Sequence, residues 1–197
     1  MKKALLSLSA LLLISNVAAA SPVMNLEKGE VAAGYSFWNP TVDALSYDLG
    51  GAYANGVFIE TGINDKTAVG FEFTQGSMNN SGVYLDTSFL DLSLKQKLNE
   101  NVQLIVGGRT YDSSVIYGAY SASTSSTKLF YGVGLTNKIT DSTSAYANIL
   151  INDISTDYQI GVNYSTRKNV ALNMNYRSYT EDDLSLQGIG LGVSCKF

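Results

Sequence analysis

The chain has 197 residues, and its 13 Lys and Arg against 17 Asp and Glu give a formal net charge of −4. This acidic balance disfavours a nucleic-acid partner, because binding to phosphates requires clustered basic side chains. The absence of His excludes Ser–His and Cys–His activation of a nucleophile and histidine ligation of a metal, and the single Cys excludes an intramolecular disulfide. We therefore expect a protein that is not an enzyme and that has no cofactor or metal site.

The first twenty residues predict export from the cytoplasm. Lys2 and Lys3 precede a short apolar stretch over residues 4–17, and three alanines over 18–20 precede Ser21. This arrangement is typical of a cleaved secretory signal peptide. The apolar stretch is too short to span a membrane as a helix, and no later one approaches the roughly 18 residues that a spanning helix needs. A retained N-terminal anchor is the alternative interpretation.

The rest of the chain shows the period-2 alternation of apolar and polar residues that predicts β-strands. Asn39 and Pro40 are expected to end the first strand. The segment 143–151 has the weakest alternation, and eight strands remain possible if it is not a strand. Otherwise we expect ten strands, over residues 29–38, 47–63, 67–75, 83–98, 102–111, 127–139, 143–151, 158–165, 170–178 and 187–197.

The links between the expected strands alternate in length. Those after the second, fourth, sixth and eighth strands have about three or four residues, whereas the others are longer, up to about fifteen for residues 112–126. Transmembrane barrels show this asymmetry, with short periplasmic turns and longer external loops. An even number of strands would place both chain ends on the periplasmic side. An ordinary antiparallel sandwich gives no reason for such alternation.

The last expected strand carries a second indication of a transmembrane barrel. Its apolar residues are Ile189, Leu191, Val193, Cys195 and the terminal Phe197, and they alternate with small or polar residues. This pattern resembles the C-terminal strand of Gram-negative outer-membrane β-barrel proteins, whose assembly machinery reads a final Phe preceded by alternate apolar residues. Cys195 departs from it, because the family more often has a larger residue there. An ordinary sheet strand is the alternative.

The resemblance is to the small barrels of the OmpA/OmpX/porin-like superfamily. It implies an all-β fold, an antiparallel up-and-down transmembrane β-barrel, located in the outer membrane. It also implies contact with outer-membrane lipid and recognition of the last strand by the barrel-assembly machinery. We accordingly expect a signal peptide over residues 1–20, a short periplasmic lead over 21–28 and the barrel over 29–197.

The apolar faces of the strands are rich in aromatic residues, as the girdles at the two membrane interfaces of a barrel are. A soluble, lipocalin-like barrel would turn these faces inward, and period 2 alone does not decide between the two. The signal peptide, the final Phe and the alternating links favour lipid outside. The aromatic residues in question are Tyr35, Phe37, Phe71, Phe73, Tyr131, Tyr158, Tyr164, Tyr176 and Phe197.

With lipid outside, the opposite faces place seven charged residues in the lumen. A ten-stranded barrel is narrow and side chains can nearly fill it, so an unpaired charge there is costly. We hypothesise that the acidic residues pair with Arg109 and Arg177, either only to pack the barrel or to line a narrow solute path. The set is Glu60, Glu72, Asp91, Lys95, Arg109, Lys128 and Arg177.

Three functions follow from these expectations. The first is a barrel with a structural or surface-interaction role, its lumen plugged by polar side chains and its external loop 112–126, with Ile116, Tyr117 and Tyr120, able to contact a surface ligand. The alternative is a narrow channel or porin for small solutes. The third, an outer-membrane enzyme, is the least favoured because His is absent.

Overall fold

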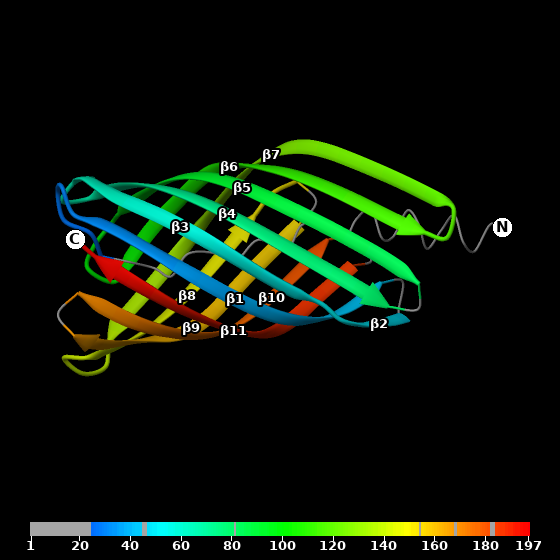
Figure 1. The fold of residues 1–197 in the computed structure, drawn as a ribbon. Coiled ribbons are helices and arrows are strands. Elements are labelled where there is room, and N and C mark those ends of the chain that lie inside the picture. The colour runs from blue at the N-terminus through cyan, green and yellow to red at the C-terminus, as the bar shows by residue number, and fades with distance from the viewer. Residues whose placement is uncertain (1–24, 45–46, 81, 154, 168, 182–183) are drawn as a thin grey trace.

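The computed structural model describes residues 25–197, apart from 45–46, 81, 154, 168 and 182–183. Within these residues eleven strands form one antiparallel sheet (Figure 1). They are β1 (Val31–Ala44), β2 (Tyr47–Gly51), β3 (Tyr53–Asn64), β4 (Thr67–Asn80), β5 (Val83–Lys97), β6 (Val102–Tyr117), β7 (Tyr120–Lys138), β8 (Thr143–Ile151), β9 (Ser155–Arg167), β10 (Val170–Glu181) and β11 (Leu184–Lys196).

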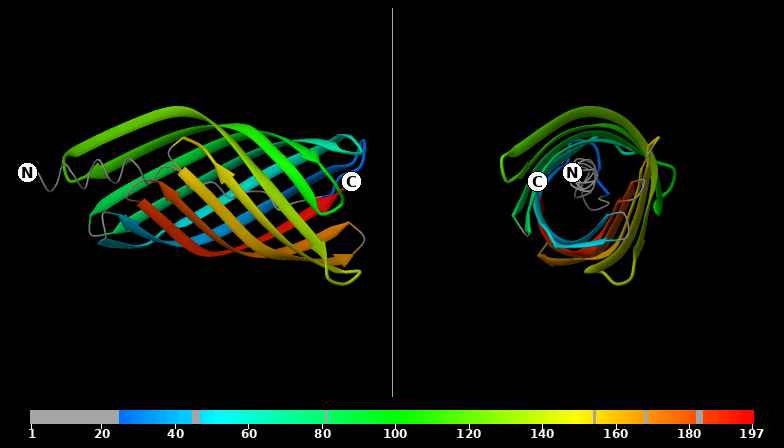
Figure 2. Two further views of the ribbon diagram at one scale, coloured as in Figure 1. Left: turned by 180° about the vertical axis from the view of Figure 1, so that it is seen from behind. Right: turned by 90° about the vertical axis from the view of Figure 1, so that its right-hand side faces the viewer.

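The sheet closes on itself because β11 pairs with β1. The short strand β2 pairs only with the last part of β1, over Thr41–Ala44, so ten strands run around the barrel. Seen along its axis, the barrel forms a ring (Figure 2). The predicted ten-stranded antiparallel barrel is therefore confirmed, and the segment with the weakest alternation is strand β8.

The two ends of the barrel are told apart by the chain ends. We call the end that holds the start of β1 and the end of β11 the turn end, and the opposite end the loop end. The links are short at both ends, since Asp65 and Lys66 connect β3 to β4 at the turn end and residues 118–119 connect β6 to β7 at the loop end. The expected alternation of short and long links is therefore wrong, because the strands continue through most of the expected loops. The part of the chain that the structure describes contains no helix long and apolar enough to cross a membrane. The expected signal peptide over residues 1–20 lies outside the described residues and stays a prediction.

The apolar strand faces point outward, as expected. All nine aromatic residues of the predicted girdles are exposed on the barrel surface, with 39–74% of their area accessible. Leu, Ile and Val fill the outer face between them. Lipid favours this arrangement, because a β-barrel satisfies its backbone internally and needs only an apolar outer surface.

The inner face is less polar than expected. Near the loop end a buried apolar cluster fills the lumen. Its side chains come from inward-facing positions of β1, β3, β4, β5, β6, β10 and β11 and pack as the core of a soluble barrel does. The cluster consists of Trp38, Val42, Ala54, Met78, Leu85, Phe89, Val115, Tyr179 and Leu186.

The expected long loop over residues 112–126 is wrong. Strand β6 continues to Tyr117 and β7 begins at Tyr120, so that only Gly118 and Ala119 turn the chain. Gly118 has a φ of 60°, a conformation that glycine adopts without strain. The polar segment after residue 75 is likewise strand, because β4 runs to Asn80. In these loop-end stretches Ser, Thr or Asn residues occur on both faces of the strands, so the alternation is weak.

The expected break at Asn39 and Pro40 is also wrong, because β1 continues through them to Ala44. The carbonyl of Pro40 accepts a hydrogen bond from the N–H of Ala52 at 2.9 Å. Pro40 lies between the end of the β3 pairing at Trp38 and the start of the β2 pairing at Thr41. Proline has no N–H to donate, and Pro40 lies at the gap between these two strand pairings, so β1 can continue through it.

Two neighbouring glycines of β6 provide a test of lumen packing. A Cβ on Gly107 would collide with the ring of Phe130 and the carbonyl of Leu92, whereas a Cβ on Gly108 would approach nothing closer than 3.9 Å, at Leu129. We expect Gly107→Ala to lower the free energy of unfolding by about 1–3 kcal/mol. The matched control Gly108→Ala should leave it nearly unchanged. Urea unfolding of the refolded protein in detergent measures both, and equal effects would contradict the inward packing of Gly107.

Candidate functional site

The most unusual feature of the barrel is a strand edge without a neighbour. Strand β7 pairs with β6 from Tyr120 to Leu135, but its pairing with β8 reaches only Tyr131. Within the described part of the chain no strand therefore lies beside residues 120–130 of β7. The hairpin of β6 and β7 projects beyond its neighbours at the loop end (Figure 1). At about 3.4 Å per residue, the free edge is roughly 35 Å long.

The orientation of the backbone along this edge follows from two hydrogen bonds. The N–H of Thr136 donates to Asn101 before β6, and the N–H of Ile139 donates to Thr143 of β8. Because backbone groups of successive strand residues point to opposite sides, odd-numbered residues of β7 face the β8 side. The residues that present both N–H and C=O groups to the free edge are thus Ser121, Ser123, Ser125, Thr127 and Leu129.

Natural proteins usually protect such an edge with charges, proline or a β-bulge. From Tyr120 to Thr127 the edge has no charged residue, no proline and no register shift. The first charge is Lys128, whose Nζ lies 2.9 Å from Oδ2 of Asp153 in the β8–β9 turn. Lys128 therefore closes the base of the edge, and the eight residues above it remain open.

The hairpin tip adds an apolar surface to the edge. Ile116, Tyr117 and Tyr120 are 50%, 44% and 67% exposed, and Tyr84 lies directly opposite Ile116 on β5. These are the three residues that the sequence indicated as contact residues of an external loop. Ile116, Tyr117 and Tyr120 instead lie at the end of β6 and the start of β7.

The lumen holds a second candidate site, a chain of ion pairs. The Nε and Nη2 of Arg109 donate to the two carboxylate oxygens of Asp91, both at 2.8 Å. Arg177 makes the same two-pronged contact with Asp157 on β9. The Nη2 of Arg109 also lies 3.8 Å from Oδ2 of Asp157. Because β6 and β9 are separated by β7 and β8, this contact crosses the lumen.

Six of the seven predicted lumen charges are buried, and their partners partly differ from those expected. Asp91 pairs with Arg109, but Glu60 contacts Lys95 at 2.5 Å instead of an arginine. Glu72 is buried beside them. The seventh, Lys128, differs from the expectation: it is half-exposed and pairs with Asp153 at the loop end, because β7 has already passed beyond the barrel wall there.

Asp157 was missed by the sequence interpretation, which assigned it to the link before β9. Strand β9 begins at Ser155, so Asp157 faces inward together with Gln159 and Asn163. Gln159 and Asn163 lie on the inner face of this strand. Asp157 is two residues before Gln159, so extending the same period-2 pattern toward the N-terminus would have placed it on that face. Missing it left Arg177 without its actual partner.

Aromatic rings support both arginines. The guanidinium carbon of Arg177 lies 5.2 Å from the centre of the Trp38 ring, and that of Arg109 lies 5.6 Å from the Phe130 ring. Such cation–π contacts strengthen when water is excluded.

A cavity beside Glu72 and Asp91 has a volume of about 30 Å³. It has room for about one water molecule and is too small for a hydrated solute.

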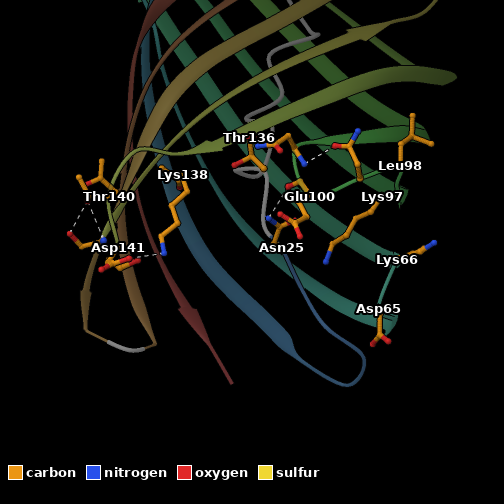
Figure 3. A pocket seen from close by; sticks show the side chains of 16 residues that line it. Asn25, Asp65, Lys66, Lys97, Leu98, Glu100, Thr136, Lys138, Thr140 and Asp141 are labelled. Atoms are coloured by element: carbon orange, nitrogen blue, oxygen red, sulfur yellow. Dashed lines mark hydrogen bonds and ion pairs between the residues drawn. The ribbon is translucent and has the colours of Figure 1, made fainter.

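At the turn end the residues before β1 fold back against the barrel. Leu26 is only 1% exposed, and its carbonyl accepts a hydrogen bond from Nζ of Lys97 at 2.8 Å. The N–H of Glu27 donates to the Glu30 carboxylate at 2.6 Å, and this bond, together with Lys196, holds the pKa of Glu30 below its usual value. Beside this segment lies an open polar pocket of about 630 Å³, lined by the turns (Figure 3).

The proposed assembly residues lie on β11 and just beyond it. Ile189, Leu191, Val193 and Phe197 are exposed on the outer face, and Cys195 is partly exposed there. The N–H of Phe197 donates to the carbonyl of Val31 at 2.7 Å and so completes the pairing of the last strand with β1.

Among the described residues no group of three or more Cys, Asp or Glu side chains could hold a metal ion.

The lumen network makes a testable contribution to stability. We expect Asp157→Ala to lower the free energy of unfolding by about 3–5 kcal/mol, because it leaves the buried Arg177 without its carboxylate. Asp153→Ala removes an aspartate whose side chain is 62% exposed, against 4% for Asp157. Its effect should stay within about 1 kcal/mol. Urea unfolding in detergent compares the two, and a small loss for Asp157→Ala would contradict the role of the network.

Known proteins share this architecture. The translocator domain of the autotransporter NalP from Neisseria meningitidis aligns over 100% of this chain and 95% of its own, with a TM-score of 0.55 and 8% identity. A second solved structure is that of Ail, the attachment invasion locus protein of Yersinia pestis. It aligns over 86% of this chain and 99% of its own, with a TM-score of 0.48 and 17% identity. Ail has also been solved in complex with the heparin analogue sucrose octasulfate. Neisserial surface protein A aligns over 86% and 98%, with a TM-score of 0.49 and 15% identity.

Only the NalP domain has a TM-score above 0.5 among these three, and at 8% identity it shows a likeness of fold alone. No curated protein matches the sequence. A family model does match, and it covers residues 6–197, nearly the whole chain. The chain therefore belongs to the family described as the outer membrane protein beta-barrel domain.

Proposed function

We propose that this outer-membrane barrel is a surface-interaction protein that docks an extended segment of a partner onto the free edge of β7. The observation that carries the proposal is the unpaired edge over residues 120–130. An extended chain added there gains main-chain hydrogen bonds from a preformed template, a recognised mode of peptide binding. The apolar tip formed by Ile116, Tyr117 and Tyr120 supplies a contact for one end of such a segment.

The lumen supports a role that does not involve transport. Ion pairs cross it at the level of Arg109 and Asp157, and an apolar cluster fills it near the loop end. Both act as packing that holds the wall under the hairpin rigid. With the interior occupied, the chemistry available to a partner lies on the outer surface. The same proposal includes export by cleavage after Ala20, recognition of β11 by the assembly machinery and the absence of catalysis.

A proline in the edge tests the docking mode. In Ser123→Pro the lost N–H faces the free edge, so the pairing of β7 with β6 remains. We expect a neutral nine-residue peptide of alternating Thr and Gln to protect the amides of Ser121, Ser125 and Thr127 from hydrogen exchange in the refolded protein, and Ser123→Pro to abolish this protection. Ser123→Ala keeps the N–H and is the matched control. Unchanged protection in Ser123→Pro would overturn the proposal.

The second candidate function is a narrow channel, and one observation favours it. The contact that crosses the lumen, between Arg109 and Asp157, is 3.8 Å long, whereas the bonds of Arg109 to Asp91 on the neighbouring strand are 2.8 Å. The crossing contact is thus the weaker one. If it separates, Arg109 can stay with Asp91 on one side and Arg177 with Asp157 on the other.

Planar-bilayer conductance distinguishes the two functions. We expect the refolded protein, its folding established by heat-modifiable gel mobility, to give no stable single-channel steps, because the ion pairs and the apolar cluster occupy the lumen. Stable steps in the unmodified protein, altered by Arg109→Ala or Glu72→Ala, would instead establish the channel.

A further inference from the structure

We infer that the segment docked on the edge of β7 is cationic, with Lys or Arg on the side chains that share the outer face of the hairpin. This inference rests on the proposed function and names the chemistry of the partner. It is carried by two carboxylates on the outer face next to the edge, Asp86 and Asp112.

The register places both carboxylates in rows that end at the free edge. In one row Ser88 of β5, Asp112 of β6 and Ser125 of β7 lie side by side. In the next row toward the tip, Asp86 of β5 lies beside Ser114 and Ser123. On the outer face of β5 both rows lie between Leu90 and the tip residue Tyr84. Because charged side chains are costly on the lipid face of a barrel, we place these rows in water.

Neither carboxylate has a basic partner in the described part of the chain. Asp86 and Asp112 are exposed and make no ion pair, unlike Asp153, which pairs with Lys128. Their charge therefore stays available to a partner. An exposed carboxylate beside a lysine would already be neutralised.

The small side chains at the edge let a partner reach this charge. Neighbouring strands lie about 4.8 Å apart, so a docked segment runs roughly 10 Å from β6. Between them the outer face of β7 carries only Ser123 and Ser125 at these rows. A Lys or Arg of the partner can lie across Ser125 and bring its charge to Asp112. Asp86 is one strand further away and should contribute less.

The same features argue against two other occupants. A polyanion would meet Asp86 and Asp112 with no free cation on the outer face of the hairpin within the described residues. A second copy in the same membrane would be related by a twofold axis along the membrane normal. Strands tilted by about 35–45° cannot then lie antiparallel or parallel edge to edge. A second copy would also oppose like charges.

The test uses the full mature chain refolded into phosphatidylcholine nanodiscs. The probes are three labelled nine-residue peptides that alternate Thr with Lys, Gln or Glu, and binding is followed by fluorescence anisotropy against empty nanodiscs. We expect the Lys peptide to bind about tenfold more tightly than the Gln peptide, from one or two surface ion pairs, and this advantage to shrink as salt rises.

The variants assign the charge effect. Asp112→Asn should weaken the Lys peptide about two- to fivefold and leave the Gln peptide unchanged, and Asp86→Asn should have a smaller effect. Asp65→Asn makes the same charge change at the turn end and is the matched control, with no effect expected.

The outcomes separate this inference from the proposed function. If the three peptides bind alike and lose binding only in Ser123→Pro, the cationic inference is overturned and edge docking stands. If none binds, edge docking itself fails. Preference for the Glu peptide, or displacement of the neutral Gln peptide by sucrose octasulfate, would assign the edge to an acidic partner and overturn the inference.

Discussion

The constraint on which this structure depends is that hydrocarbon offers no partner to a backbone N–H or C=O. Within the lipid the ten strands satisfy it by closing β11 onto β1, with the last bond at Phe197 and Val31. The free edge of β7 begins beyond Tyr131, the last residue paired with β8. An open edge is allowed only where water can reach it. The position at which pairing stops therefore sets the highest level that lipid can reach along this side of β7.

The same exclusion of water governs the lumen. Charged side chains enclosed by the wall must find partners inside it, and they do so as bidentate pairs of Arg109 with Asp91 and of Arg177 with Asp157. Pairing of this kind adds little net stability compared with apolar packing, but removing one member is costly. The network thus fixes the relation of β5, β6, β9 and β10 to one another. A fixed wall gives the β6–β7 hairpin a rigid base from which to project.

The sequence predicted the strands correctly where they cross the lipid, because there the outer face must be apolar and the inner face is more polar. The alternation of β3 or β10 is visible because every second residue must be apolar, and even the weak β8 follows from it. The prediction failed at the loop end, where both faces of β6 and β7 carry Ser and Thr and a strand looks like a loop. The same loss of contrast hid Asp157 at the start of β9 and misplaced Lys128. Pairing partners across the lumen depend on barrel register, which no single strand encodes.

Because side chains fill the lumen and β7 has an unpaired edge, a partner would contact the outer surface of the barrel. Main-chain hydrogen bonds along β7 would give affinity with little regard to sequence, because every extended segment offers them. Discrimination must then come from side chains beside the edge. The serines of β7 are too small to select a partner by shape, so the selecting groups lie one strand further in, where Asp112 is the nearest exposed charge. An edge of this kind selects for charge and extended conformation before it selects for sequence.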